Sequence, residues 1–338
     1  MSKTLSIIIP AYNVERFLPK CVDSIIDERI MNDAEVLIIN DGSKDGTLFV
    51  AQQYASKYPS YIKAIDKPNG NYGSVMNKAL EICEGKYFRT LDADDYFDKE
   101  NFVKFVNELK KTDADMVITE WSFDYEGKIE NQVFESDIIP NKDIFVESPD
   151  FKFHPESPLL SIHGITYKVE KLKQSGIRWD EGISYTDTEY CFWPIKYIES
   201  VRYVPLNLYY YFIGREEQTM SQTSLRKNFN SFYIVANSIY DNLVCNQAKN
   251  SIMFAFQKRY IRIVSKFIYE NLLIEDNKHE LEIKKFDNKI KGILSLYEEI
   301  GNDLRFKRIK YVKLFRGKGL GLFLIKVLRF IHNFEYSK

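Results

Sequence analysis

The chain has 338 residues, 45% of them hydrophobic, which is enough to bury the core of one large domain or of two domains. The formal net charge of −1 excludes the strongly basic composition that marks a polyanion-binding protein. The four cysteines are widely spaced and form no Cys/His cluster, so neither a zinc site nor a disulfide framework is supported. No uncharged apolar run approaches the ~20 residues of a spanning helix and no signal peptide begins the chain, so we expect a cytoplasmic protein.

The first 120 residues alternate between short apolar runs and amphipathic stretches. The apolar runs predict strands at Leu5–Pro10, Val36–Asn40, Ile62–Asp66, Tyr87–Leu91 and Met116–Thr119. The amphipathic stretches predict helices at Leu18–Asp27, Leu48–Lys57, Val75–Cys83 and Phe102–Leu109. This alternation indicates an α/β fold, with a mostly parallel sheet covered by helices on both faces. In such sheets, ligands bind beyond the carboxyl ends of the strands.

The rest of the chain is less regular at first and then helical. Residues Trp121–Pro158 predict a loop-rich connection with short strands. We expect a strand at Ser161–Lys168, a strand-to-helix transition over Gly182–Phe192 and an aromatic strand at Val201–Phe212. Beyond Ser224, helical periodicity covers three stretches: Phe229–Leu243, Ile252–Leu273 and Leu281–Tyr297.

Three carboxylates, in the sequence Asp92-Ala93-Asp94-Asp95, directly follow the predicted strand Tyr87–Leu91. They repel one another, and a hard divalent cation that carries a phosphate would offset this charge. The alternative is a helix N-cap, chiefly for Asp95. His163, beside Gly164 in a strand-like stretch, is the one histidine that we consider as a further metal ligand.

Two other polar segments also follow predicted strands. Asp41–Gly46 mimics the start of an EF-hand loop, but Gln52 stands where that loop needs a bidentate Glu. We therefore expect a turn in which Asp41 accepts a hydrogen bond from a base N–H and Ser43 caps the next helix. Asn69–Asn77 contains two glycines and three asparagines, which allow close backbone approach to an anionic or polyhydroxy ligand. An ordinary turn capped by Ser74 is the alternative, and both can hold together.

Tyr185–Glu189 places the carboxylate of Asp187 at the start of a predicted helix. This carboxylate is either a functional group or an N-cap.

Together, the segments IIIPAYNVE, INDGSKDGT, NGNYGSVMN, LDADD and YTDTEY resemble those of the inverting family 2 glycosyltransferases of the GT-A fold. The likeness is to bacterial enzymes that extend surface polysaccharides, and it covers about residues 4–222. It implies a GT-A domain over residues 1–223, with a nucleotide-sugar half (1–120) and an acceptor half (121–223). A helical region would follow over residues 224–338.

The resemblance also implies roles for individual residues. Asp92 and Asp94, on either side of Ala93, match the Asp-x-Asp motif, in which the first lies near the ribose and metal and the second binds the metal directly. Asp187 matches the general base, although Thr186 stands where the family has Glu. The stretch that folds over the diphosphate corresponds to Arg215, Gln218 and Ser221. The base and ribose would lie against Pro10, Ala11, Tyr12, Asn13, Glu15, Asp41, Asn69, Gly73 and Asn77.

The implied cofactors are Mn²⁺ or Mg²⁺ and a nucleotide-diphosphate sugar with a uracil base. The cation would offset charge on the departing diphosphate, while a carboxylate takes the proton of the attacking hydroxyl. A nucleotidyltransferase is one alternative, but the turn after the first strand lacks the Gly-rich, basic loop that holds a triphosphate. A non-catalytic sugar-nucleotide or glycan-binding module is the other, and the intact set of Asp92, Asp94 and Asp187 argues against it.

The C-terminal segment Leu304–Phe334 has no Asp or Glu. Within it, Lys313–Phe334 mixes cations with Leu, Ile and Phe, which is typical of a helix lying in an anionic membrane interface. We therefore expect peripheral attachment to the inner face of the cell membrane. The expected acceptor is a glycan or a lipid-linked saccharide. A helix packed on the protein or an oligomer contact is the alternative. The nine cations of the segment are Arg305, Lys307, Arg308, Lys310, Lys313, Arg316, Lys318, Lys326 and Arg329.

Overall fold

The computed structural model describes residues 3–132, 140–152, 154, 156–158, 160–214, 227–271, 279–302, 316 and 323–327. The chain forms two compact units. Unit 1 comprises residues 1–216 and 248–254, and unit 2 comprises residues 217–247 and 255–338. The predicted domain boundary at residue 223 lies outside the described residues and stays a prediction.

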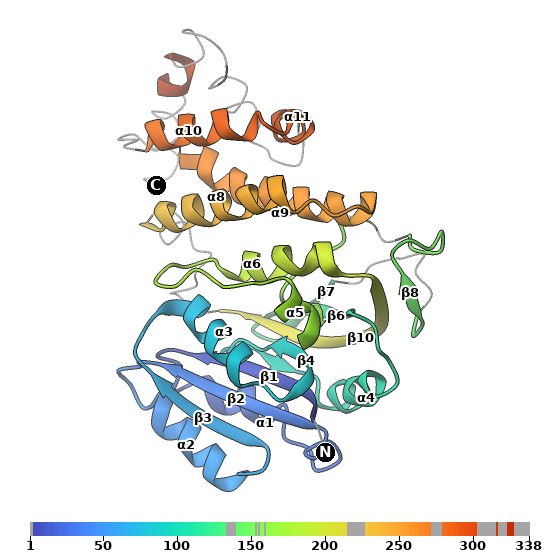
Figure 1. Ribbon diagram of the computed structural model, residues 1–338. Coiled ribbons are helices and arrows are strands. Elements are labelled where there is room, and N and C mark those ends of the chain that lie inside the picture. The colour runs from blue at the N-terminus through green and yellow to red at the C-terminus, as the bar shows by residue number, and fades with distance from the viewer. Residues whose placement is uncertain are drawn as a thin grey trace. The chain divides into compact units, whose positions relative to one another are not determined.

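Unit 1 is built on a sheet in which the strands follow the order β3-β2-β1-β4-β9-β6-β10-β5, with β7 paired to β6 and β8 to β10 (Figure 1). The described strands are β1 (Lys3–Ala11), β2 (Ala34–Asp41), β3 (Ile62–Lys67), β4 (Gly85–Thr90), β5 (Tyr96–Phe97), β6 (Met116–Tyr125), β7 (Lys128–Gln132), β8 (Asp143–Phe145), β9 (Ile165–Lys168) and β10 (Ser200–Ile213). The helices of this unit are α1 (Leu18–Asp23), α2 (Thr47–Lys57), α3 (Asn71–Ile82), α4 (Lys99–Leu109), α5 (Val169–Gln174), α6 (Asp187–Phe192) and the 3₁₀ helix η1 (Trp193–Tyr197).

The parallel core of the sheet follows the sequence prediction. β1 pairs in parallel with β2 and β4, and β2 pairs in parallel with β3. Ile7, Ile8 and Ile9 of β1 are all fully buried, so both faces of this strand are covered, as its unbroken apolar run predicted. The carboxyl ends of β1, β2 and β4 therefore meet at one edge of the sheet, where the polar motifs follow.

The second half of the sheet is mixed. β9 lies between β4 and β6 and is antiparallel to both. This arrangement brings the segment just before β9 to the carboxyl end of β4. β5 pairs antiparallel with β10, and Tyr209 stands opposite Phe97. These long-range pairings place residues from distant parts of the chain beside Asp92 and Asp95.

Two local predictions are wrong. No strand begins at Gly182, because Gly182 and Tyr185 have left-handed backbone angles (φ +76° and +68°) that interrupt an extended chain. Asp95 does not cap a helix either. The N-cap of α4 is Asp98, whose Oδ1 accepts a hydrogen bond from Asn101 N at 2.8 Å.

Unit 2 contains the helices α8 (Phe229–Cys245), α10 (Glu280–Ile290) and α11 (Leu294–Asn302) and most of α9 (Ser251–Glu270). Phe232 of α8 stacks on Phe267 of α9 with ring centroids 4.7 Å apart. The predicted single helix Leu281–Tyr297 is in fact two helices, broken near Gly292. A Cβ at Gly292 would lie 2.7 Å from Tyr240 Oη, so the break occurs where the backbone passes close to α8.

One cation of the basic C-terminal segment packs within unit 2. Arg316 Nε donates to Asp287 Oδ1 at 2.6 Å, and its guanidinium lies 3.5 Å from the centroid of the Tyr297 ring. Of the remaining segment only residues 323–327 are described, with Ile325 buried and Phe323 exposed. Among the helices that the structure describes, none has the length and apolar character needed to cross a membrane.

Candidate active site

Four carboxylates gather at the carboxyl end of β4. Asp92, Asp94 and Asp95 follow the strand directly, and Asp187 begins α6. Burial, together with the charges of Asp94 and Asp187, raises the pKa of Asp92 to about 8. Burial also raises the pKa of Asp187 above its ordinary value. The structure thus brings the predicted metal motif and the predicted base together.

The described part of the chain supplies no ion-pair partner for Asp92, Asp95 or Asp187. Burial and the neighbouring Asp94 and Asp92 hold the pKa of Asp95 well above its usual range. Such a cluster of carboxylates is relieved either by protonation or by a bound cation.

The residues present fit a divalent cation. Ligand atoms of Asp92, Asp95 and His163 lie within 4.8 Å of one another. His163 Nδ1 is buried and has no hydrogen-bond partner among the described residues. Burial and the nearby Arg89 lower the pKa of His163 to about 3, so its imidazole is neutral and free to bind a metal. Two carboxylates and one imidazole form a donor set that can bind a divalent cation.

This group differs from the predicted set in one member. The sequence assigned the metal to Asp92, Asp94 and His163, whereas the converging atoms belong to Asp92, Asp95 and His163. Asp94 lies beside the group and affects the pKa of both neighbouring acids. Its role as a direct ligand stays a prediction.

Two tyrosines of β10, which sequence reasoning missed, support the acids. Tyr209 Oη donates to Asp95 Oδ2 and accepts from Asp92 N at 3.3 Å. The ring of Tyr211 stacks on that of His163 with centroids 4.8 Å apart. The two tyrosines are two residues apart, so they project from the same face of the strand. The spacing of these two tyrosines in the aromatic sequence of β10 was the signal from which their shared position beside the acids could have been predicted.

Asn13 and Glu15, at the turn after β1, hold the turn after β2. Asn13 has a left-handed backbone (φ +52°), and its Oδ1 accepts from Lys44 N at 2.8 Å. Glu15 Oε2 accepts from Gly46 N at 2.8 Å. Ser43 Oγ accepts from Asn13 N at 3.0 Å and does not cap α2, so that prediction is wrong. These bonds give both turns one fixed shape.

The two ends of the turn after β1 differ in exposure. Pro10 and Ala11 belong to β1, and Ala11 is buried. The side chain of Tyr12 is 49% exposed and so remains available to a ligand at the sheet edge.

Asp41, at the end of β2, holds the loop after β3 with one carboxylate oxygen. Its Oδ1 accepts from Lys67 Nζ at 2.6 Å and from Gly70 N at 3.0 Å. Asn69 Nδ2 donates to the Asp41 carbonyl oxygen at 2.9 Å. Asp41 Oδ2 takes no part in these bonds, and its contact with a base N–H stays a prediction.

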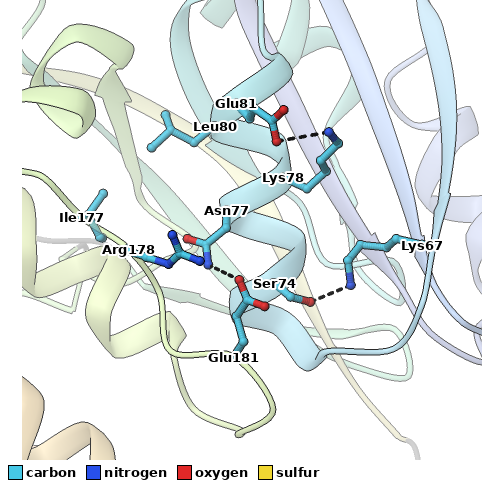
Figure 2. A pocket seen from close by; sticks show the side chains of 9 residues that line it. All are labelled: Lys67, Ser74, Asn77, Lys78, Leu80, Glu81, Ile177, Arg178 and Glu181. Atoms are coloured by element: carbon cyan, nitrogen blue, oxygen red, sulfur yellow. Dashed lines mark hydrogen bonds and ion pairs between the residues drawn. The ribbon is translucent and has the colours of Figure 1, made fainter.

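Gly73 and Asn77 of α3 contact the segment that precedes α6. A Cβ at Gly73 would lie 2.0 Å from the Asp180 carbonyl oxygen, so only glycine allows this approach. Asn77 Oδ1 accepts from Trp179 N at 3.0 Å, and its Nδ2 donates to Glu181 Oε1 at 2.8 Å (Figure 2). Contact of these two residues with a nucleotide stays a prediction.

A cavity of about 540 Å³ lies beside this contact (Figure 2). Ser74 Oγ, in its wall, donates to Asn71 O at 2.8 Å from inside α3, so Ser74 is not the cap of that helix. Arg215, Gln218 and Ser221 lie outside the described residues. The cavity is lined by Lys67, Ser74, Asn77, Lys78, Leu80, Glu81, Ile177, Arg178 and Glu181.

The family model described as Glycosyl transferase family 2 matches residues 6–175, half of the chain. The chain belongs to this family. The match begins in β1 and ends after α5, so it includes the acids at the end of β4 and His163 but stops before Asp187. By its family, the protein is a glycosyltransferase.

Similar proteins agree with this assignment. The uncharacterized glycosyltransferase EpsJ of Bacillus subtilis is 33% identical over 117 residues, which cover 35% of this chain and 33% of EpsJ. The poly(ribitol-phosphate) beta-glucosyltransferase of Bacillus spizizenii is 27% identical over 170 residues, covering 48% of this chain and 26% of the relative. The alignments thus span a third or less of these relatives.

The solved structure of S. aureus TarS 1–349 in complex with UDP-GlcNAc matches with a TM-score of 0.62. The match covers 98% of this glycosyltransferase and 91% of that chain, at 17% sequence identity. This likeness shows the GT-A fold, followed by a helical C-terminal region.

Proposed function

We propose that this glycosyltransferase moves a sugar from a UDP-sugar to a hydroxyl group of a glycan or lipid-linked acceptor, with inversion at the anomeric carbon. The observation that carries the proposal is the group Asp92, Asp95 and His163, with Asp187 close enough to raise the pKa of Asp92. One end of this arrangement suits a cation and its diphosphate, and the other suits proton removal from an acceptor.

Bound nucleotide would lie across the ends of β1 and β2. The exposed ring of Tyr12 offers a surface on which a base stacks, and Asp41 Oδ2 offers an acceptor for a base N–H. A uracil base is supported by the complex of TarS with UDP-GlcNAc, a protein of the same fold. Loop contacts from Asn13 and Glu15 would keep this surface rigid.

Asp92, Asp95 and His163 would hold a divalent cation, with Asp94 as the ligand that the sequence predicts. When bound, this cation supplies positive charge that offsets the negative charge developing on the departing diphosphate. Tyr209 orients Asp95 and so acts on the donor set from outside.

Asp187 would take the proton from the acceptor hydroxyl. As this proton leaves, the hydroxyl oxygen forms a bond to C1 of the donor sugar, and the bond from C1 to the diphosphate oxygen breaks. Burial raises the pKa of Asp187, which makes its carboxylate a stronger proton acceptor than an exposed one. A single displacement inverts the configuration at C1, and no second carboxylate nucleophile is needed.

The acceptor is proposed to be a bacterial surface polymer or its lipid-linked precursor. The similarity to a poly(ribitol-phosphate) beta-glucosyltransferase supports this class. Peripheral attachment to an anionic membrane is supported by the composition of Leu304–Phe334. Because Arg316 binds Asp287, this part of the proposal depends on the eight other cations of the segment. The family match disfavours both a nucleotidyltransferase and a non-catalytic module.

The decisive test measures donor turnover. Purified protein is incubated with a panel of UDP-sugars and GDP-sugars, with Mn²⁺, Mg²⁺ or a chelator, and nucleotide release is followed with and without polymer extracts. We expect metal-dependent release of UDP from one UDP-sugar, accelerated by an acceptor. Full activity with chelator, or a preference for GDP-sugars, would contradict the proposal.

A further inference from the structure

The chain just before α6 is fastened to α3 by side chains that the reaction itself does not use. We propose that Asn77 and Glu189 are positioning residues that act through this segment to set the place of Asp187. The inference deepens the proposed function and rests on Asp187 being the base. It assigns to Asn77 a role other than the nucleotide contact that the sequence predicted.

Asn77 forms the first half of the attachment. Its Oδ1 accepts from Trp179 N, and its Nδ2 donates to Trp179 O, each at 3.0 Å. The same Nδ2 donates to Glu181 Oε1 at 2.8 Å (Figure 2). The side-chain amide of Asn77 therefore bonds both the N–H and the carbonyl oxygen of Trp179, as the backbone of a neighbouring β-strand would. Trp179 itself is buried and stacks at 6.5 Å on Tyr190 of α6.

Gly70 and Gly73, at the start of α3, allow the segment that precedes α6 to approach this helix closely. Gly182 N donates to Gly70 O at 2.8 Å, and the Asp180 carbonyl lies where a side chain on Gly73 would otherwise be. Two glycines and one asparagine of Asn69–Asn77 therefore hold the segment that precedes α6.

Glu189 forms the second half. It lies on α6, two residues after Asp187, and only 1% of its surface is exposed. Its Oε2 accepts from Asp180 N at 3.0 Å. A carboxylate that is this buried and bonded to backbone is poorly placed to receive a proton from an acceptor, although its position near Asp187 makes it the alternative base.

The attachment links the base to the rest of the site. Asn77 holds residues 179–181, Glu189 joins Asp180 to α6, and α6 carries Asp187. Tyr190 anchors the same helix to β4, since its Oη donates to Phe88 O at 3.2 Å. Tyr72, on α3 next to Gly73, has its pKa raised well above the usual range by burial and by Asp92 and Asp187. Tyr72 of α3 therefore lies within electrostatic range of both Asp187 and Asp92.

The test combines kinetics with hydrogen exchange of residues 178–192 in the full-length protein. Asn77→Ala and Glu189→Ala should lower kcat about 10- to 100-fold, because displacement of a reacting group by about 1 Å has effects of this order. KM for the UDP-sugar should stay within about twofold, since donor contacts are untouched. Both variants should speed exchange in residues 178–192.

Glu189→Gln is the decisive variant. Its amide oxygen still accepts from Asp180 N, so a positioning role predicts kcat within about threefold of the natural chain, whereas a base role predicts the full loss. Loss equal to that of Glu189→Ala would overturn the inference. Lys78→Ala is the matched control, because Lys78 neighbours Asn77 on α3 and pairs only with Glu81 among the ion pairs described.

Failure of the inference is distinguishable from failure of the proposed function. If Asp187→Asn keeps full turnover, the base assignment is wrong, and the exchange data still report on the attachment. If Asn77→Ala leaves exchange and kcat unchanged, the positioning role is wrong. Should Asn77→Ala not fold, Glu181→Ala removes one of the three bonds from an exposed residue and should give the same faster exchange to a smaller extent. Unchanged exchange in that variant would also overturn the inference.

Discussion

Tyr209 Oη donates a hydrogen bond to Asp95 Oδ2, and this bond joins the last long strand of the sheet to the acids that follow β4. The same hydroxyl accepts from Asp92 N, so one phenol holds two members of the proposed cation site. The bond exists only because β10 runs antiparallel to the short strand β5, with Tyr209 opposite Phe97.

Tyr209→Phe is therefore expected to weaken Mn²⁺ binding by about 10- to 100-fold, the usual effect of removing a group that orients a metal ligand. Isothermal titration with Mn²⁺ in the presence of UDP measures this directly. Tyr210→Phe is the control, because Tyr210 points to the other face of β10 and its Oη accepts from Asn207 Nδ2 at 3.1 Å. If both variants bind Mn²⁺ with the same affinity, Tyr209 does not orient a metal ligand.

The two candidate metal acids, Asp94 and Asp95, should behave differently. Asp94→Ala is expected to abolish transfer and the Mn²⁺-dependent part of nucleotide binding while the fold survives. Asp95→Ala should also lower the melting temperature, because the variant removes the hydrogen bonds that Asp95 accepts from Phe212 N at 2.8 Å and from Tyr209 Oη. Thermal unfolding and Mn²⁺ titration of both variants separate the roles. Full activity of Asp94→Ala with a chelator present would make the metal assignment wrong.

His163→Gln tests the imidazole as a ligand. The neutral imidazole ring of His163 packs against Tyr209, Tyr211 and Trp121. Glutamine keeps most of the side-chain volume in this aromatic environment but lacks the imidazole nitrogen whose electron pair would bind the metal. We expect a loss of Mn²⁺ affinity with little change in UDP affinity in the absence of metal. Unchanged Mn²⁺ affinity would leave His163 as a packing residue of the aromatic wall.

Asp187→Asn should retain donor binding and lose turnover by a factor of about 10² to 10⁴, the usual effect of removing a positioned proton acceptor. The base must be deprotonated to act, so kcat should rise with pH through a pKa above the ordinary carboxyl value, in line with the burial of Asp187. The variant should lack this limb of the pH profile. A loss of less than tenfold in a folded variant would place the base elsewhere.

Deletion of the chain after Asp303 should release the protein from anionic vesicles and spare activity on a short soluble acceptor. Each cation near an anionic surface contributes about 1 kcal/mol, an attraction that salt screens. The deletion also removes Arg316, which bonds Asp287 and Tyr297 O, so a loss of stability is expected as well. Arg316→Ala controls for this, since it should lower the melting temperature and leave vesicle binding nearly unchanged. Equal co-sedimentation with anionic and neutral lipids would argue for a packing or oligomer role.

The sequence alone was sufficient for the parallel half of the sheet and for the place of the acids. Runs such as Ile7–Pro10 bury both faces of a strand, and Asp41 and Asp92 follow such runs directly, so they lie at one edge in any parallel arrangement. These features are local, because the burial of a strand and the position of its end depend on residues that are neighbours in the sequence. The same local signals failed at Gly182–Tyr185, where left-handed backbone breaks an apparently extended run.

Only the tertiary structure decided which residues meet. His163 reaches Asp92 because β9 inserts antiparallel beside β4, and Tyr209 reaches Asp95 through the pairing of β10 with β5. Asn77, which the sequence assigned to a nucleotide, forms hydrogen bonds with Trp179 and Glu181. Such contacts depend on the order and direction of strands and on the packing of distant loops. No periodicity along the chain encodes them, because they are set by the joint burial of segments that are far apart in sequence.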